Sequence, residues 1–338
     1  MIATIELSSL APEPAAMTIG VLERNRAVLQ RATRVVRAAA NFAWVAAEDQ
    51  PSALRGRLAP QARLLACDGA DAGVVLAWSG LAAARVAAWS HEPHALLPLA
   101  ERDERLVSLI GWPAFQSMPR SWEIALATRT ILAPHAEPTE LRDVFAGAPV
   151  AAELRPRDPR DRERVVLEVG ALVERTGAGP RLAARVGEAA HELIMNATYD
   201  APIDAHGEPS YRHDRRAHVI LRDHEVPIVQ FATDGMQVAV RVLDRFGRLT
   251  RDQVLASLRQ GADAAHAAAA AVVDPSRGGA GLGLWRVYAA AAVTIVDVVP
   301  GYRTSVTAIF DVDVGARDAR NLPPSLHVFD HGRLGSQG

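Results

Sequence analysis

A chain of 338 residues is longer than one hydrophobic core usually supports, so the length alone predicts two domains of ordinary size. With 49% hydrophobic and 22% charged residues, the composition is that of a folded globular protein and excludes an extended disordered chain. The formal net charge of -2 offers no field that would attract nucleic acid or an anionic membrane, so neither is expected as a partner.

The single cysteine, Cys67, cannot form an internal disulfide, and no basic stretch followed by a long apolar run marks a signal peptide. The most apolar stretches, 72–89 and 288–299, are interrupted by Arg85 and Asp297, which leaves runs too short to cross a bilayer. We therefore expect a cytoplasmic protein without a membrane anchor.

Residues 1–16 hold two prolines among small residues and predict a flexible tail. Over residues 17–134, short apolar runs alternate with segments of helical spacing, which predicts a doubly wound parallel five-stranded α/β sheet. The expected strands are 18–22, 42–46, 63–67, 85–89 and 106–110.

Three prolines and a glycine then predict a linker over residues 135–150. Helical spacing at 162–175 and 180–199 precedes two strand pairs around short turns, so residues 151–314 are expected to form an α+β layered domain. The expected strands are 226–232, 237–243, 293–299 and 304–311, and residues 315–338 are expected to be a tail, with an edge strand at 326–329 as the alternative.

Three polar residues share one face of the predicted helix 180–199. Glu188, Glu192 and Asn196 follow one another at intervals of four, which places neighbours about 5–6 Å apart. Carboxylate and amide oxygens suit Mg²⁺, which prefers oxygen ligands. An acidic stripe on a solvated surface is the alternative reading of this pattern.

Two further segments carry candidate binding residues. Asp244 and Gly247 follow a predicted strand, where a carboxylate can accept a hydrogen bond from an exocyclic amine such as that of adenine. Gly279, Gly281 and Gly283 lead into an apparent helix at 285–292, and clustered glycines at a helix start can present backbone N–H groups to phosphate.

These three segments resemble the motif boxes of GHKL ATPases, the superfamily that includes sensor histidine kinases and anti-sigma-factor serine kinases. Residues 191–197 resemble the N box, 244–247 the adenine-binding box and 279–284 the second glycine box, in the order that the superfamily shows. The resemblance covers residues 151–314 and implies a Bergerat-type ATP-binding sandwich with ATP and Mg²⁺ as ligands.

The resemblance also implies a role for each matching residue. Asn196 would ligate Mg²⁺, Glu192 would be the catalytic residue that orients or deprotonates the attacking group, and Asp244 would bind the adenine amine. Thr304 resembles the superfamily's threonine near adenine, and the glycines Gly279, Gly281 and Gly283 would form the hinge of a lid over the nucleotide, with Gly247 beside the base.

The sequence departs from the superfamily pattern in two places. In the adenine box, Phe246 precedes Gly247 and Leu249 stands where a second glycine would follow. Tyr199 stands where histidine kinases often carry a cation after the box asparagine. Arg245 or Arg277 would then meet the phosphate charge.

The layout is closer to anti-sigma-factor serine kinases than to sensor histidine kinases. His135 lies between Pro134 and Pro138, where a continuous helix carrying a phosphoaccepting histidine is not expected. The implied partner is a regulatory protein, such as a sigma factor, an antagonist or a response regulator, and a homodimer is possible by the same resemblance.

Residues 17–134 resemble a degenerate response-regulator receiver of two-component signalling. Asp68 ends the third predicted strand at the place of a phosphoacceptor, and Ser90 ends the fourth. Arg24 and Trp112 replace an acidic metal ligand and a lysine, so a receiver-like domain that binds partners without being phosphorylated is expected.

The sequence thus predicts a Mg-ATP-binding signalling protein, an ATP-dependent protein kinase (transferase) of serine/threonine or histidine type, or an ATP-gated regulator of a partner. Two alternatives remain open. One is a non-catalytic adaptor whose nucleotide only orders a lid at 251–277. The other is a histidine kinase whose accepting histidine lies on another chain.

Overall fold

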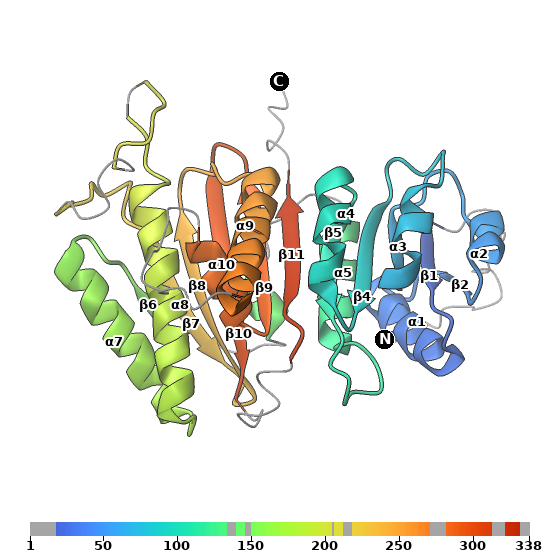
Figure 1. Cartoon of the computed structure of the whole chain (residues 1–338), viewed down its shortest axis with the longest axis horizontal. Helices are drawn as coiled ribbons and strands as arrows, with labels where there is room; N and C mark the ends of the chain where they lie inside the picture. The colour runs from blue at the N-terminus through green and yellow to red at the C-terminus, as the bar shows by residue number, and fades with distance from the viewer. Residues whose placement is uncertain are drawn as a thin grey trace, which may run out of the picture. The chain divides into compact units, whose positions relative to one another are not determined.

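The computed structural model describes residues 18–133, 140–145, 150–204, 206–211, 218–270, 282–312 and 322–331. The chain divides into two compact units, Met1–Pro134 and His135–Gly338, each with its own strands and helices (Figure 1). The expected tail at 1–16, most of the linker at 135–150 and the glycines Gly279 and Gly281 lie outside the described residues.

The first unit is built on parallel strands in the order β2-β1-β3-β4-β5. Helices connect successive strands, as a parallel sheet requires. The elements are β1 (Ile19–Leu22), α1 (Arg26–Ala39), β2 (Ala46–Glu48), α2 (Pro51–Arg57), β3 (Leu64–Asp68), α3 (Gly69–Leu76), β4 (Arg85–Ser90), α4 (Leu97–Arg102), β5 (Leu106–Gly111) and α5 (Ser121–Leu132).

Helices cover both faces of this parallel sheet. Ile19 and Val21 of β1 belong to the core that α1 and α5 close, whereas a side chain at Gly20 would meet Leu54 and Leu58 from α2. Burial from both sides explains why these strands are nearly continuous apolar runs in the sequence.

The second strand begins later than residues 42–46, where the sequence predicts it. Asn41 and Phe42 have positive φ values of 53° and 59°, a left-handed conformation that no strand contains. Both residues lie in the turn that follows α1. The second strand pairs with β1 only from Ala46 onwards, opposite Gly20.

The second unit contains a mixed sheet in the order β11-β9-β10-β8-β7-β6, antiparallel except for the parallel pair β9–β11. Residues 325–330, expected in the C-terminal tail, form β11 within this sheet. The elements are α6 (Leu141–Val144), β6 (Val150–Leu154), α7 (Pro159–Arg175), α8 (Pro180–Tyr199), β7 (Ile228–Thr233), β8 (Gln237–Asp244), α9 (Arg251–Ala270), α10 (Gly283–Ala290), β9 (Val293–Val299), β10 (Arg303–Asp311) and β11 (Ser325–Asp330).

Helices α7 to α10 form one layer over one face of this sheet (Figure 1). The apolar stripe Val165, Val169 and Val173 of α7 is buried, and α8 contacts both α7 and strand β8. Asp158 caps α7 by accepting a hydrogen bond from the Asp161 N–H at 2.9 Å. This layer places the N-terminal end of α10 and the C-terminal half of α8 above the strand ends that carry polar residues.

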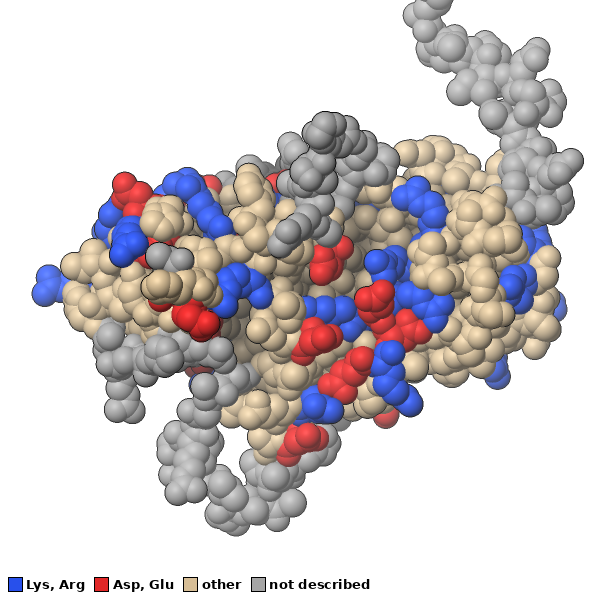
Figure 2. All heavy atoms as spheres, turned by 90° about the horizontal axis from the view of Figure 1, so that it is seen from above, with Lys and Arg blue, Asp and Glu red and all other residues tan. Residues whose placement is uncertain are grey.

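Charged side chains of both signs are interspersed on the face of the molecule that Figure 2 shows. In the described part of the chain, no helix combines the length and the apolar character that a bilayer crossing demands.

Gly247 is a position near the candidate site where neighbouring backbone leaves no room for a side chain. Its φ is +58°, and a Cβ there would lie 2.2 Å from the carbonyl oxygen of Val299 and 2.7 Å from the backbone nitrogen of Tyr302. Residue 247 must therefore be glycine for the β9–β10 turn to pack against it.

We expect Gly247→Ala to lower the free energy of unfolding by roughly 3 kcal/mol or more, because conformational strain and a backbone clash add together. Gly235→Ala is the matched control, since Gly235 has a φ of +88° and open space around it. That control should cost only about 1 kcal/mol of strain. Urea denaturation of both variants measures the difference, and equal losses would show that the close approach to Val299 is not rigid.

Candidate functional site

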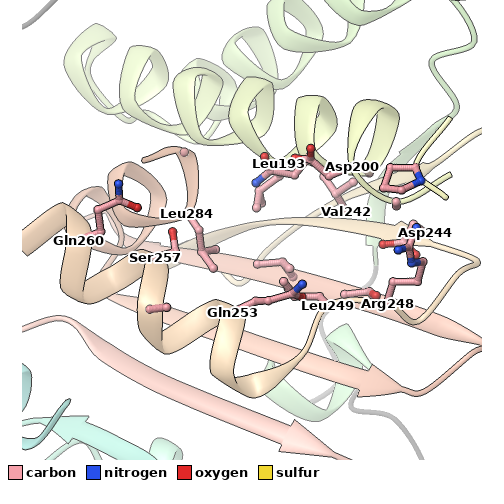
Figure 3. A pocket seen from close by; sticks show the side chains of 18 residues that line it. Leu193, Asp200, Val242, Asp244, Arg248, Leu249, Gln253, Ser257, Gln260 and Leu284 are labelled. Atoms are coloured by element: carbon pink, nitrogen blue, oxygen red, sulfur yellow. The ribbon is translucent and has the colours of Figure 1, made fainter. Parts of the chain in front are cut away.

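A cavity of about 400 Å³ lies in the second unit between α8, α9, the first turn of α10 and the strands β8 and β10 (Figure 3). Asn196, Asp244, Gly283 and Thr304, four residues that the sequence singles out, all line it. They come from four elements that are far apart in the chain. The volume falls in the range of ligand-binding pockets of proteins.

Asp244 supplies a buried carboxylate to the cavity from the end of β8. The side chain is 8% exposed, and its Oδ1 accepts hydrogen bonds from the backbone N–H groups of Phe246 at 2.8 Å and Gly247 at 3.3 Å. Burial raises the pKa of Asp244 to about 6, although these N–H groups and Thr304 act to lower it. One oxygen is thus held by the loop, which leaves the carboxylate able to accept from a ligand.

Thr304 pairs with Asp244 across the β8–β10 ladder and lines the same cavity. Its hydroxyl is buried and lies close enough to Asp244 to act on the pKa of that carboxyl. Asp244 and Thr304 therefore form a buried polar end of the cavity.

Gly283 brings the start of α10 against α8. A Cβ at Gly283 would lie 2.6 Å from Oε2 of Glu192 and 3.6 Å from Oδ1 of Asn196. The third glycine of the predicted glycine box is thus a close approach between two helices, which no larger residue permits without displacing Glu192.

Glu192 does not line the cavity. It lies one helical turn before Asn196, and it lines a neighbouring groove between α7, α8 and α10. Its Oε1 accepts a hydrogen bond from Nη1 of Arg286 at 2.9 Å, and the glutamate side chain is 19% exposed. The expected catalytic carboxylate is therefore held by α10 at the boundary of the cavity.

The remaining site residues of the sequence analysis are placed as follows. Gly247 donates to Asp244 and shapes its loop without lining the cavity, and Gly279, Gly281 and Arg277 lie outside the described residues. Arg245, the other cation expected to meet phosphate, is exposed and is not part of the cavity lining.

The sequence analysis missed the contribution of α9. Gln253, Ser257 and Gln260 line the cavity from one face of this helix, while Val254 and Leu258 are buried on the other. The spacing of four and three residues, in a helix otherwise rich in alanine, is the signal that could have found this polar stripe.

Arg248 was missed as well. It lines the cavity at the same end as Asp244, opposite Leu284 and Gln260 (Figure 3). Its Nη1 is buried and has no hydrogen-bond partner within the described residues. A single arginine after a glycine has no distinctive spacing, so nothing in the sequence singles it out.

Asp68 belongs to the first unit and is not among the residues that line the cavity. It ends β3, and its Oδ1 caps α3 by accepting from the Ala70 N–H at 2.7 Å. Nearby, Nη2 of Arg24 binds Oδ1 of Asp71 at 2.7 Å. The Arg24 guanidinium thus lies beside a cluster of acidic side chains formed by Glu23, Asp68 and Asp71.

Glu23, the neighbour of Arg24, is buried, and its Oε2 accepts from Nε1 of Trp89 at 2.7 Å. Burial raises the pKa of Glu23, and the negative charges of Asp68 and Asp71 add to the effect. The carboxylates of Glu23, Asp68 and Asp71 in this acidic cluster therefore all accept hydrogen bonds from neighbouring groups of the first unit.

Within the described parts of the chain, no three His, Cys, Asp or Glu side chains are arranged to hold a metal ion. The cavity instead offers the Asn196 amide oxygen near the start of α10, which fits a cation bound mostly by phosphate and water oxygens. The buried Thr304 hydroxyl and the Asp244 carboxylate fit a base with an exocyclic amine.

No known protein-family profile matches the chain, and no curated protein matches it significantly. Among solved structures it is similar to a chain of the SiaB-SiaC complex from Pseudomonas aeruginosa, with 17% identity and a TM-score of 0.33. The similarity covers 50% of this chain and 95% of that chain. A likeness this weak establishes neither the fold nor the function.

The raised pKa of Asp244 makes a prediction about stability. The folded state binds the proton near pH 6 and the unfolded chain near 3.8. Stability from this group is therefore full below pH 3.8 and is lost as the pH rises through 6. We expect the free energy of unfolding, relative to Asp244→Asn, to fall by about 2–3 kcal/mol between pH 4 and pH 7. The free energy of unfolding is measured by urea denaturation of both proteins at each pH. If it changes with pH by the same amount in both, the raised pKa of Asp244 is contradicted.

Proposed function

We propose that the second unit binds Mg-ATP and that the protein acts as a kinase or an ATP-gated regulator of a partner protein. The observation that carries the proposal is the convergence of Asn196, Asp244, Gly283 and Thr304 on one cavity. Each comes from a different element. Asn196, Asp244 and Gly283 match positions of the GHKL motif boxes, and Thr304 matches the superfamily's threonine near adenine. A Bergerat-type sandwich and a receiver-like first unit are part of the same proposal.

The geometry suggests how the nucleotide would lie. The base would occupy the end of the cavity at Asp244, where the carboxylate accepts from its exocyclic amine and Thr304 lies across the ladder. The phosphates would lie towards Gly283, where the first N–H groups of α10 and the Asn196 amide meet. Mg²⁺ bound by Asn196 would neutralise phosphate charge there.

In the kinase form of the proposal, a hydroxyl of the partner attacks the terminal phosphorus. The new bond joins the hydroxyl oxygen to that phosphorus, the bond to the bridging oxygen breaks, and ADP leaves. Glu192 would take the hydroxyl proton as the general base. The role requires the Glu192 carboxylate to turn from Arg286 towards the cavity.

The pairing of Glu192 with Arg286 also favours a second candidate function. If the pair stays closed with nucleotide bound, the unit would be a nucleotide-gated binding module that performs no transfer. In that case, occupancy of the cavity would act through α9, whose polar face lines it.

Asn196→Ala should abolish the Mg²⁺-dependent part of ATP binding, because it removes the one side-chain ligand proposed for the cation. Calorimetric titration of the full chain with ATP, with and without Mg²⁺, measures this. Glu188→Ala is the matched control, since Glu188 lies two turns earlier on α8 and lines the groove but not the cavity. Unchanged Mg²⁺ dependence in Asn196→Ala would remove the proposed metal role.

The two candidate functions differ in whether the protein transfers a phosphoryl group to its partner. Incubation with labelled ATP and candidate partner proteins should place phosphate on a partner hydroxyl if the chain is a kinase. Glu192→Gln should then reduce the rate by roughly 100-fold or more while nucleotide still binds. Binding without any transfer to the partners tested would favour the gated module.

A further inference from the structure

The phosphate end of the cavity has no cation among the described residues that line it. Arg248 is the one arginine or lysine in that lining, and Figure 3 places it near Asp244, at the opposite end from Leu284. A triphosphate at the Gly283 end carries several negative charges and is normally met by a guanidinium or an ammonium group. Among the described residues, a side chain outside the lining is then the candidate to add to the charge that Mg²⁺ supplies.

Arg286 is the described cation best placed to do so. It lies three residues after Gly283, in the first turn of α10, and its side chain is 52% exposed. Its Nη1 is bound to Oε1 of Glu192 at 2.9 Å. Among the residues that line the groove beside the cavity, it is the one arginine or lysine.

The Glu192 carboxylate lies at the wall between groove and cavity. Its Oε2 is the atom closest to a Cβ built on Gly283, at 2.6 Å, and Asn196 on the cavity side is the next residue in contact. One oxygen therefore faces Arg286 and the other faces the helix start that lines the cavity. A rotation of the Glu192 side chain, without movement of α8, would move its carboxylate from the groove with Arg286 towards the cavity.

We infer that the Arg286–Glu192 ion pair is a latch that a nucleoside triphosphate opens. Arg286 leaves Glu192 to bind the terminal phosphate, and the freed Glu192 carboxylate turns into the cavity as the proposed general base. Arg286 is a positioning and charge-neutralising residue in this scheme. The inference rests on the proposed function, because it assumes that phosphates lie at the Gly283 end.

The latch discriminates between nucleotides. A ligand shifts such an equilibrium only by its differential affinity for the open and closed states. ADP lacks the γ-phosphate that would bind Arg286, so it leaves the pair closed. ATP offers Arg286 an acceptor that carries more charge than the carboxylate it gives up.

The test is calorimetric titration of the full chain with Mg-ATP and with Mg-ADP. Arg286→Ala should weaken ATP binding by roughly 10- to 100-fold, the effect of one charge-assisted contact. ADP binding should stay within about twofold of the parent value. Glu192→Gln should strengthen ATP binding and leave ADP binding unchanged, because the competing anion is gone. Arg181→Ala, an exposed arginine at the start of α8, is the control for loss of surface charge and should change neither affinity.

The double variant Arg286→Ala with Glu192→Gln separates two causes of a lost ATP affinity. If Arg286 binds phosphate, the double variant stays as weak as Arg286→Ala. If it recovers to the parent affinity, the loss came only from an unpaired Glu192, and the inference is overturned. Equal weakening of ATP and ADP in Arg286→Ala, or no weakening, overturns it too. A parent protein that binds neither nucleotide refutes the proposed function itself, and that result is visible before any variant is made.

Discussion

The buried carboxylate of Asp244 is the constraint on which the candidate site depends. It ends β8, it is held by the backbone N–H groups of the loop that follows, and it pairs across the ladder with Thr304. The loop can close this way only because Gly247 adopts a positive φ against the β9–β10 turn. One acidic side chain thus ties a strand end, a loop and a turn to the same cavity, at the cost of a desolvated charge.

The helix layer completes the site by close approach. Gly283 lets α10 begin directly against Glu192 and Asn196, and these two residues, one turn apart on α8, line different spaces. Asn196 faces the cavity, and Glu192 faces the groove and Arg286. A charged pair on the rim of a cavity is exchangeable, because solvent and ligand can both compete for it. The carboxylate to which the proposed function assigns catalysis is thus held outside the cavity lining.

Patterns with a strong period or a fixed spacing were predictable from the sequence. The range 180–199 is α8 as its helical spacing indicated, and the i, i+4 relation of Glu192 and Asn196 holds on that helix. The direction of each side chain was not predictable, because Arg286 draws Glu192 aside through a contact 94 residues away in sequence. The late start of β2 was not predicted, and the strand β11 was predicted only as the alternative to a tail, for a similar reason. Backbone conformation at Asn41 and pairing with β9 are decided by tertiary structure.

The polar stripe of α9 has a consequence for folding. Gln253, Ser257 and Gln260 line a cavity that also contains a buried threonine hydroxyl and a carboxylate disfavoured by burial. Burial of such polar groups costs stability, and any molecule that binds them in the folded state adds its binding free energy to that state. A ligand bound in the cavity would then protect the folded chain, so its lifetime against proteolysis would increase with the ligand concentration.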